Sequence, residues 1–327
     1  MSRPRSEKIV ELKAKLITRI REGFLRPGDR FMSNRVLAAR FGVSYQTAHR
    51  LSAELCSEGW IERRRASGTY IAGQRRTLTG VQFLFHERAQ RAGSFGSRLL
   101  KQLCARLKDE KIEHAVSFVR KRAFLDPNLF PVVWECMETV LPRLNEGQYA
   151  LLLHDLPPAG LAGSFIDTVS TDDFSGGLCA AEIFNRRGCT KAMVLAGPKT
   201  DARCVRRVEG FRSLLPDAEV IWSGGWFRED GLEVAPCLFK KKPQALFCCN
   251  DRLAEGVVCH YKKQRHRPPE IIGFDDAPIA EALNITTIAI PWDELVEAAM
   301  GIVRKRISGN TSTASRQILA PRPVIRR

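Results

Sequence analysis

Two pairs of neighbouring carboxylates and ten cysteines are the residues whose types could support catalysis or hold a metal ion. The carboxylate pairs, Asp172–Asp173 and Asp275–Asp276, fall where the pattern predicts a turn and the end of a strand. The cysteines include the adjacent pair Cys248–Cys249, and no two have the Cys-x-x-Cys spacing typical of zinc and dithiol sites. The sequence therefore predicts no catalytic residues, no metal and no cofactor, and we expect that the protein is not an enzyme.

Positive charge is concentrated near the N-terminus. The chain of 327 residues has a net charge of +16, and residues 1–79 hold 17 Lys or Arg against 7 Asp or Glu, which gives +10. Three of these cations stand together at Arg63–Arg65. A basic segment of this kind favours a polyanion as partner, and a merely basic soluble surface is the alternative.

The elements that carry this charge form a helix-turn-helix and a hairpin in the prediction. Apolar residues recur at helical spacing over residues 9–20, and Ser33 and Ser44 are suited to capping two further helices through residues 40 and 58. Gly42 fits the left-handed position between these two helices. Residues 60–71 then predict a two-stranded wing whose tip carries the three arginines, which suits them to phosphates or a narrow minor groove.

From Val81 onward, short apolar runs alternate with helical stretches. The predicted strands cover residues 81–85, 115–119, 149–153, 192–196, 220–222, 245–249 and 270–274. The predicted helices cover residues 97–109, 132–144, 175–187, 203–215, 230–239 and 252–263. This alternation predicts an α/β fold with parallel sheets covered by helices on both faces, which binds ligands at the carboxyl ends of its strands. Asn250 and Asp275 stand at such ends, and no nucleotide-binding glycine motif is present.

Membrane insertion and secretion are not expected from the sequence. No run approaches the ~18 to 20 apolar residues that a membrane-spanning helix needs. The first residues have charge but no apolar stretch behind them, so they do not form a signal peptide. We therefore expect a cytoplasmic protein without a membrane partner.

Residues 7–73 resemble the winged-helix domain of the GntR family of bacterial regulators. The resemblance rests on Leu25-Arg26-Pro27-Gly28-Asp29-Arg30, on Leu37-Ala38-Ala39-Arg40-Phe41-Gly42-Val43-Ser44, and on Glu58-Gly59 and Gly68-Thr69. It implies that the third helix enters the major groove of double-stranded operator DNA. The residues implied to face DNA are Arg35, Ser44, Tyr45, Gln46, Thr47 and His49, with Arg63, Arg64, Arg65, Gly68 and Thr69 in the wing.

Two departures from that family affect what the helix would read. The family often has Arg where Tyr45 and His49 stand, and Arg is the usual reader of guanine. Gln46 would instead favour adenine. Alternatives that involve no DNA remain open, since Ser44 can be a plain helix cap and Tyr45 a partly buried ring.

Residues 81–327 resemble the effector domain of the LacI/GalR repressors, which share the fold of periplasmic sugar-binding proteins. The match is strongest over residues 166–291 and rests on Arg207-Val208-Glu209-Gly210-Phe211, on the apolar strand ending in Asn250-Asp251, and on Gly273-Phe274-Asp275-Asp276. It is weak over residues 81–165. The resemblance implies two subdomains, with chain crossings near residues 167, 290 and 319, and a ligand in the cleft between them.

The same resemblance implies which residues contact that ligand. They are Arg207, Trp226, Asn250 and Asp275, with Phe95 and His86 as weaker candidates. Arginine and aspartate suit vicinal hydroxyls, and an indole suits the apolar side of a sugar ring. Arg207 as a structural salt bridge, Trp226 as core and Asp251 as a helix cap are the alternatives.

These patterns predict a winged helix-turn-helix over residues 1–73, a linker over 74–80 and an effector-binding domain over 81–327. The function they favour is a DNA-binding transcriptional regulator, a repressor of a catabolic operon controlled by a small-molecule effector, a sugar. We expect a homodimer on a palindromic operator. A sugar-binding protein without a regulatory role is the alternative.

Overall fold

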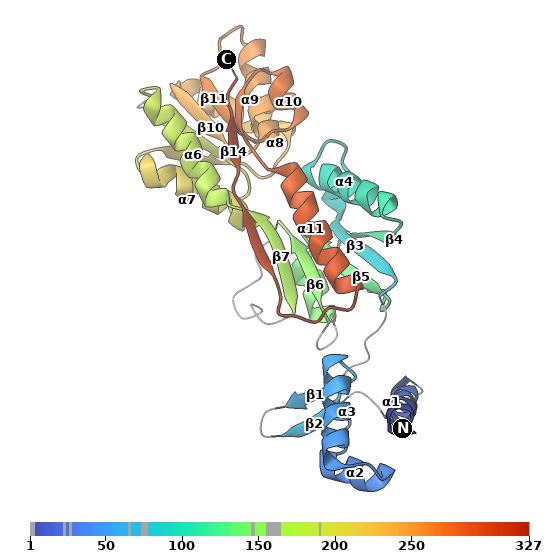
Figure 1. The fold of residues 1–327 in the computed structure, drawn as a ribbon. Helices are drawn as coiled ribbons and strands as arrows, with labels where there is room; N and C mark the ends of the chain where they lie inside the picture. The colour runs from blue at the N-terminus through green and yellow to red at the C-terminus, as the bar shows by residue number, and fades with distance from the viewer. Residues whose placement is uncertain are drawn as a thin grey trace.

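The computed structural model describes residues 4–21, 24–25, 28–64, 67–72, 78–144, 148–154, 165–189 and 191–326. The N-terminal part contains three helices and a hairpin (Figure 1). These elements are α1 (Pro4–Arg21), α2 (Asn34–Phe41), α3 (Tyr45–Ser57), β1 (Ile61–Arg64) and β2 (Gly68–Ile71). Most of the predicted linker, residues 74–77, lies outside the described residues, as does Arg65.

The predicted caps of α2 and α3 are confirmed. The side chain of Ser33 accepts a hydrogen bond from the Val36 amide, and that of Ser44 accepts one from the Thr47 amide. Gly42 ends α2 with φ of 62°, in the left-handed region that favours glycine. These local signals fix the turn between α2 and α3, and the apolar faces of the helices then pack around Leu51, which is fully buried.

The hairpin is held by a segment that precedes α2. Phe31 N donates to Thr69 O, and Ile71 N donates to Asp29 O, so residues 28–31 pair with β2 on the side away from β1. Gly68 begins β2 with φ of 127°, which only glycine adopts readily. The wing is therefore tied to the helix-turn-helix through its backbone.

The C-terminal part contains two six-stranded sheets (Figure 1). The first has the order β13-β7-β6-β5-β3-β4, and all of its neighbouring strands are parallel. Its strands are β3 (Gly80–His86), β4 (Glu113–Val119), β5 (Leu129–Trp134), β6 (Ala150–Leu153), β7 (Ile166–Thr171) and β13 (Arg316–Leu319). Helices α4 (Phe95–Asp109) and α11 (Trp292–Ile307) pack against each other and against this sheet.

The second sheet has the order β14-β12-β11-β10-β8-β9, and only the pair β12–β14 is antiparallel. Its strands are β8 (Ala192–Ala196), β9 (Glu219–Trp222), β10 (Ala245–Cys248), β11 (Glu270–Asp275), β12 (Thr286–Ala289) and β14 (Arg322–Val324). Its helices are α6 (Asp173–Arg186), α7 (Ala202–Leu214), α8 (Arg228–Lys241), α9 (Asp251–Lys263) and α10 (Pro278–Ala282). The predicted α/β class with a winged helix-turn-helix and a two-subdomain, parallel-sheet body is thus the observed fold.

The chain passes between the two sheets three times. It leaves the first sheet after β7 and enters α6, returns between β12 and α11, and leaves again between β13 and β14. The first crossing follows Thr171 rather than residue 167, because residues 166–171 are themselves a strand of the first sheet. The other two fall at residues 289–292 and 319–322.

The helix predicted over residues 132–144 is wrong at its start. Residues 129–134 form the buried central strand β5, and helix begins only with the short α5 (Met137–Val140). The run Phe130–Trp134 is apolar throughout because both faces of β5 are covered, so its periodicity does not separate a strand from a helix. Its two adjacent valines favour the strand.

A buried ion pair joins α11 to the first sheet. Arg306 Nε and Nη2 donate to the two oxygens of Asp167 at 2.7 and 2.8 Å, and both side chains are at most 1% exposed. The guanidinium also lies 3.7 Å from the centre of the Tyr149 ring. This pair anchors the helix that follows the second crossing.

Candidate functional site

A cavity of about 370 Å³ lies where the carboxyl ends of the two sheets meet. Trp134 ends β5 and His154 follows β6 on one side, while Asn250 follows β10 and Asp275 ends β11 on the other. Open parallel sheets bind ligands at this edge. Five of the six predicted effector-site residues line the cavity, namely Phe95, Arg207, Trp226, Asn250 and Asp275.

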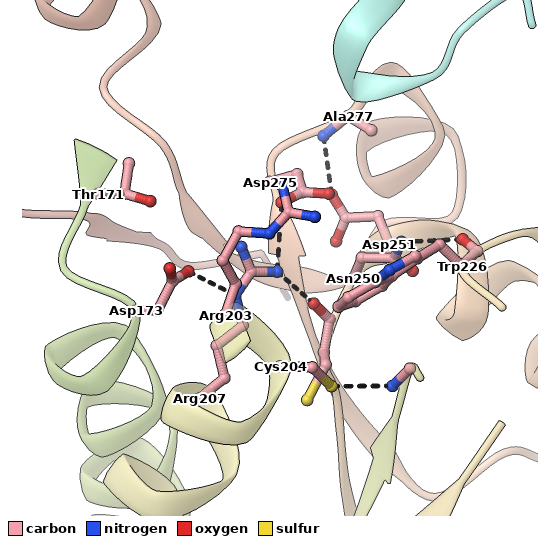
Figure 2. A network of polar contacts seen from close by, with 12 residues as sticks. Thr171, Asp173, Arg203, Cys204, Arg207, Trp226, Asn250, Asp251, Asp275 and Ala277 are labelled. Atoms are coloured by element: carbon pink, nitrogen blue, oxygen red, sulfur yellow. Dashed lines mark hydrogen bonds and ion pairs between the residues drawn. The ribbon is translucent and has the colours of Figure 1, made fainter. Parts of the chain in front are cut away.

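Arg207 on α7 lines the cavity and is only 3% exposed, and Figure 2 shows it within a network of polar contacts. Its Nε donates to Asp173 Oδ1 at 2.7 Å, and its Nη1 donates to Cys249 O at 2.6 Å. The same Nη1 lies 3.6 Å from Asp275 Oδ1, and the guanidinium lies 3.6 Å from the centre of the Phe274 ring. Arg207 therefore forms a structural salt bridge and also contributes to the cavity wall.

Asp275 is a carboxylate that is 17% exposed and has an unusual backbone conformation. Burial raises its pKa to about 6, with a further rise from Asp173, while Arg207 acts in the opposite direction. Its φ of 96° is in the region that side chains other than glycine rarely adopt. Strain of this kind occurs at ligand sites, where the surrounding structure holds a side chain in a working position.

Asn250 positions helix α9. Its Oδ1 accepts a hydrogen bond from Leu253 N at 2.8 Å, and its Nδ2 donates to Trp226 O at 2.9 Å. The alternative that made Asp251 the cap is thus wrong, since Asn250 caps the helix. The Asp251 carboxylate accepts instead from Ala277 N and from Thr287 Oγ1, and burial holds its pKa well above the usual range.

Aromatic rings form the wall on the side of the first sheet. The Phe95 ring lies 4.4 Å from His154, 4.7 Å from Trp292 and 6.2 Å from Trp134, centre to centre. Burial holds the pKa of His154 well below its ordinary value, so its imidazole is neutral at neutral pH. From the opposite subdomain, Trp226 adds an indole whose Nε1 donates to an Asp201 oxygen at 3.2 Å.

His86 is the predicted effector residue that does not line the cavity. Its Nδ1 accepts a hydrogen bond from the Arg88 amide and so caps a short 3-10 helix, η1 (Glu87–Gln90). Nδ1 is thus engaged in the loop that follows β3, and contact of His86 with a ligand stays a prediction.

Several cavity residues were missed from the sequence. They are Arg88, Arg98, Lys101, Trp134, His154, Arg203, Arg252 and Trp292. Five of them lie within residues 81–165, the part of the chain whose motifs are weak. The available signal was positional, because Trp134 and His154 stand at the ends of buried strands, as Asn250 and Asp275 do.

The predicted DNA-facing residues lie on α2, α3 and the wing. Tyr45 is 54% exposed, so its ring is not buried, and Gln46 and His49 are exposed on the same helix. Ser44 and Thr47 are engaged with each other, with their hydroxyl oxygens 2.8 Å apart. Contact with DNA by any of these residues stays a prediction.

The remaining members of that set that the structure describes are also exposed, apart from Thr69. Arg35, Arg63, Arg64 and Gly68 are exposed, and Thr69 is half-buried. Arg64 donates to Glu62 and lies 4.5 Å from the centre of the Tyr70 ring, which leaves Arg63 as the less engaged cation of β1.

Two family models match the chain. Residues 8–71 match the bacterial regulatory proteins of the gntR family, and residues 181–327 match a periplasmic binding protein-like domain. The two matches cover the winged helix and most of the part that carries Arg207, Asn250 and Asp275.

Curated relatives match the body of the chain. The HTH-type transcriptional repressor PurR of Vibrio cholerae is 28% identical over 157 residues, which is 44% of this chain and 47% of that protein. The NTD biosynthesis operon regulator NtdR of Bacillus subtilis is 31% identical over 174 residues, which is 49% of this chain and 53% of that protein. The chain thus spans about half the length of these relatives.

Solved structures share the fold. A LacI family transcriptional regulator from Enterococcus faecalis with bound ribose superposes with a TM-score of 0.63 at 19% identity, covering 75% of this chain and 97% of that one. The complex of the transcriptional regulator CelR with cellobiose gives 0.65 at 16% identity, covering 90% and 99%.

The class of protein follows from these findings. The body has the two-subdomain fold of LacI-family regulators. The chain joins a GntR-family winged helix to a periplasmic-binding-protein-like domain. In the described residues, no helix is both long and apolar enough to cross a membrane.

Proposed function

We propose that this protein is a cytoplasmic transcriptional regulator that binds operator DNA as a homodimer and represses a catabolic operon until a sugar binds its body. One observation carries the proposal: a GntR-type winged helix and a ligand-sized cavity between two parallel sheets occur in a single chain. The relatives it matches are named as transcriptional regulators.

The head supports DNA binding through its charge and its exposed helix. Residues 1–79 carry a net charge of +10, and Gln46 and His49 stand exposed on α3, which would occupy the major groove. Arg63 of the wing would contact a phosphate or the adjacent minor groove. The proposed domain limits, 1–73 for the head, 74–80 for the linker and 81–327 for the body, assign these roles to separate units.

The cavity supports a sugar through its mixture of rings and polar groups. Trp226 and Phe95 offer flat faces for the apolar side of a sugar ring. Asp275 offers acceptors for hydroxyl groups, and Arg207 offers donors beside it. A volume of about 370 Å³ is within the range of small-molecule sites.

Closure of the cleft would link the two binding events. Contacts already cross it: Arg98 Nη1 donates to Asp276 O at 3.0 Å, and Arg252 Nη2 donates to Gly93 O at 2.9 Å. Arg203 of the second subdomain also pairs with Glu135 of the first. A ligand that touches both walls favours the closed arrangement, and the three crossings transmit the change to the heads of the dimer.

The test is a fluorescence anisotropy titration of full-length protein against DNA from upstream of its own gene and of adjacent operons. The proposal predicts binding to one fragment over an unrelated fragment, and release of that fragment on addition of one sugar. Gln46→Ala should weaken binding to the preferred fragment. Thr18→Ala, an exposed neutral change on α1, is the matched control and should bind as the parent does.

Two results would contradict the proposal. Equal affinity for every fragment, unaffected by Gln46→Ala, would remove sequence-specific DNA binding. Sugar binding without any DNA binding would instead favour a sugar-binding protein that has no regulatory role.

A further inference from the structure

We infer that the cavity selects an anionic effector, a sugar that carries a phosphate or carboxylate group, and that Arg98 and Lys101 of α4 hold its charge. The inference rests on the proposed function, because it names the chemical class of the ligand in the same cavity. It depends on residues that the resemblance did not assign to the site.

Three residues that line the cavity have buried hydrogen-bond donors without an acceptor. Among the described residues, the buried side-chain atoms without a partner include Arg88 Nε, Trp134 Nε1 and Arg252 Nε. All three are donors, and all three residues line the cavity. Trp134 is only 2% exposed, so its N–H has no access to bulk water. A buried donor costs free energy until it is paired, but these three atoms have almost no accessible surface in the cavity, so a ligand would reach them only after side chains of the wall move.

The carboxylates that line the cavity are already matched by cations. Glu135 pairs with both Arg88 and Arg203, at 8% exposure of its own side chain. Asp275 faces Arg207. Arg207 also pairs with Asp173, which does not line the cavity. These carboxylates are therefore poor partners for a cationic ligand, which would have to compete with a guanidinium for each one.

Arg98 and Lys101 are matched more weakly, since Asp275, Asp276 and Asp293 attract Arg98 only from beyond ion-pair distance. The two cations lie three residues apart on one face of α4, and both line the cavity. Among the described residues, no carboxylate forms an ion pair with either. Arg98 donates to one backbone carbonyl and lies 4.2 Å from the centre of the Trp292 ring, and these two contacts hold the guanidinium in place.

The start of α4 adds to this positive field. Helix α4 has 15 residues and is capped by Ser94, and its first turn, including Phe95 and Ser97, lines the cavity. The positive end of the helix dipole thus lies close to the two cations. Oxygens of a phosphate or carboxylate would meet this end while the sugar ring rests against the aromatic wall.

The experiment is isothermal titration calorimetry on the full-length protein with matched triplets of ligands: glucose, glucose 6-phosphate and glucuronate, and ribose, ribose 5-phosphate and riburonate. Sodium phosphate at the same ionic strength is the blank. In at least one triplet, we expect the charged member to bind at least about tenfold more tightly than the neutral sugar. The charged member that binds more tightly identifies whether the effector carries a phosphate or a carboxylate group.

Variants then locate the charge. Lys101→Gln and Arg98→Gln should each remove about tenfold of the preference for the charged ligand over its neutral sugar. Lys108→Gln, an exposed change on the same helix outside the cavity, is the matched control. Arg98→Lys keeps the positive charge but loses the planar, forked guanidinium. It should retain more of the preference for the charged ligand than Arg98→Gln does.

Failure of the inference differs from failure of the proposed function. A neutral sugar that binds as tightly as its charged partners, with no loss in Lys101→Gln, would overturn the inference and leave a regulator controlled by a neutral sugar. If sodium phosphate binds as tightly as the sugar phosphate, the sugar ring contributes nothing to binding and the inference of a sugar effector is overturned. No binding of any compound, neutral or charged, would overturn both.

Discussion

Replacing Asp275 with asparagine should make the ligand-free protein more stable at neutral pH, although it damages the proposed ligand site. Burial raises the pKa of this carboxyl from 3.8 to about 6 in the folded protein. Each pKa unit is worth 1.36 kcal/mol, so ionising Asp275 costs the folded state about 3 kcal/mol. This value already includes the attraction of Arg207, because Arg207 acts on the same pKa.

The sign of the pH dependence follows from the raised pKa. Below pH 3.8 the carboxyl is neutral in both the folded and the unfolded chain, and it has no effect. As the pH rises toward 6, the unfolded chain releases its proton first, and stability is lost until the folded carboxyl also ionises. Asparagine does not titrate, so Asp275→Asn should exceed the parent by about 3 kcal/mol at pH 8 and by about half of that at pH 5.

Urea unfolding of the parent and Asp275→Asn between pH 5 and pH 8 measures this difference directly. Asp276→Asn is the matched control, because its carboxylate is partly exposed and pairs with Arg326 at 2.7 Å. The control should give no gain at pH 8. If Asp275→Asn is less stable than the parent at pH 8, the pair with Arg207 outweighs burial and the reasoning is refuted.

Three further changes follow from the packing and from the head. Arg306→Met leaves the buried carboxylate of Asp167 without its cation and should lower the free energy of unfolding in urea by about 3–5 kcal/mol. Arg304→Met, at a partly exposed ion pair, should lower it by about 1 kcal/mol. Equal losses would contradict the argument from burial. Gly177→Ala places a methyl group 1.9 Å from a backbone oxygen of α7 and should lower the melting temperature, whereas Gly301→Ala meets no atom within 4 Å and should raise it slightly. Arg63→Ala should reduce the slope of log affinity for DNA against log salt by about 1, and an unchanged slope would contradict a wing contact with phosphate.

Local signals explain why the head was predictable from the sequence. Ser33, Gly42 and Ser44 act on backbone groups within a few residues of themselves, so their types and spacing are enough to place α2 and α3. The strand ends at Asn250 and Asp275 were predictable for a similar reason, since each follows a short apolar run.

The wall formed by the first sheet was not predictable in the same way. Trp134 and His154 reach the cavity only because β5 and β6 are neighbours in the sheet, and that pairing depends on contacts between distant residues. The apolar run of β5 also lacked a period that would separate a strand from a helix, and the prediction failed there. The raised pKa of Asp275 likewise has no local signal, because it depends on Arg207 and Asp173, which are distant in the sequence.

The central claim is that DNA and effector binding are linked through one chain. The most direct test measures the Kd for the preferred DNA fragment with and without saturating effector, and the Kd for the effector with and without that DNA. Thermodynamic linkage requires the two ratios to be equal, and a repressor released by its effector predicts DNA binding weakened by roughly 5- to 150-fold, with effector binding weakened equally. Two ratios equal to one would contradict the account, because the head and the cavity would then act independently.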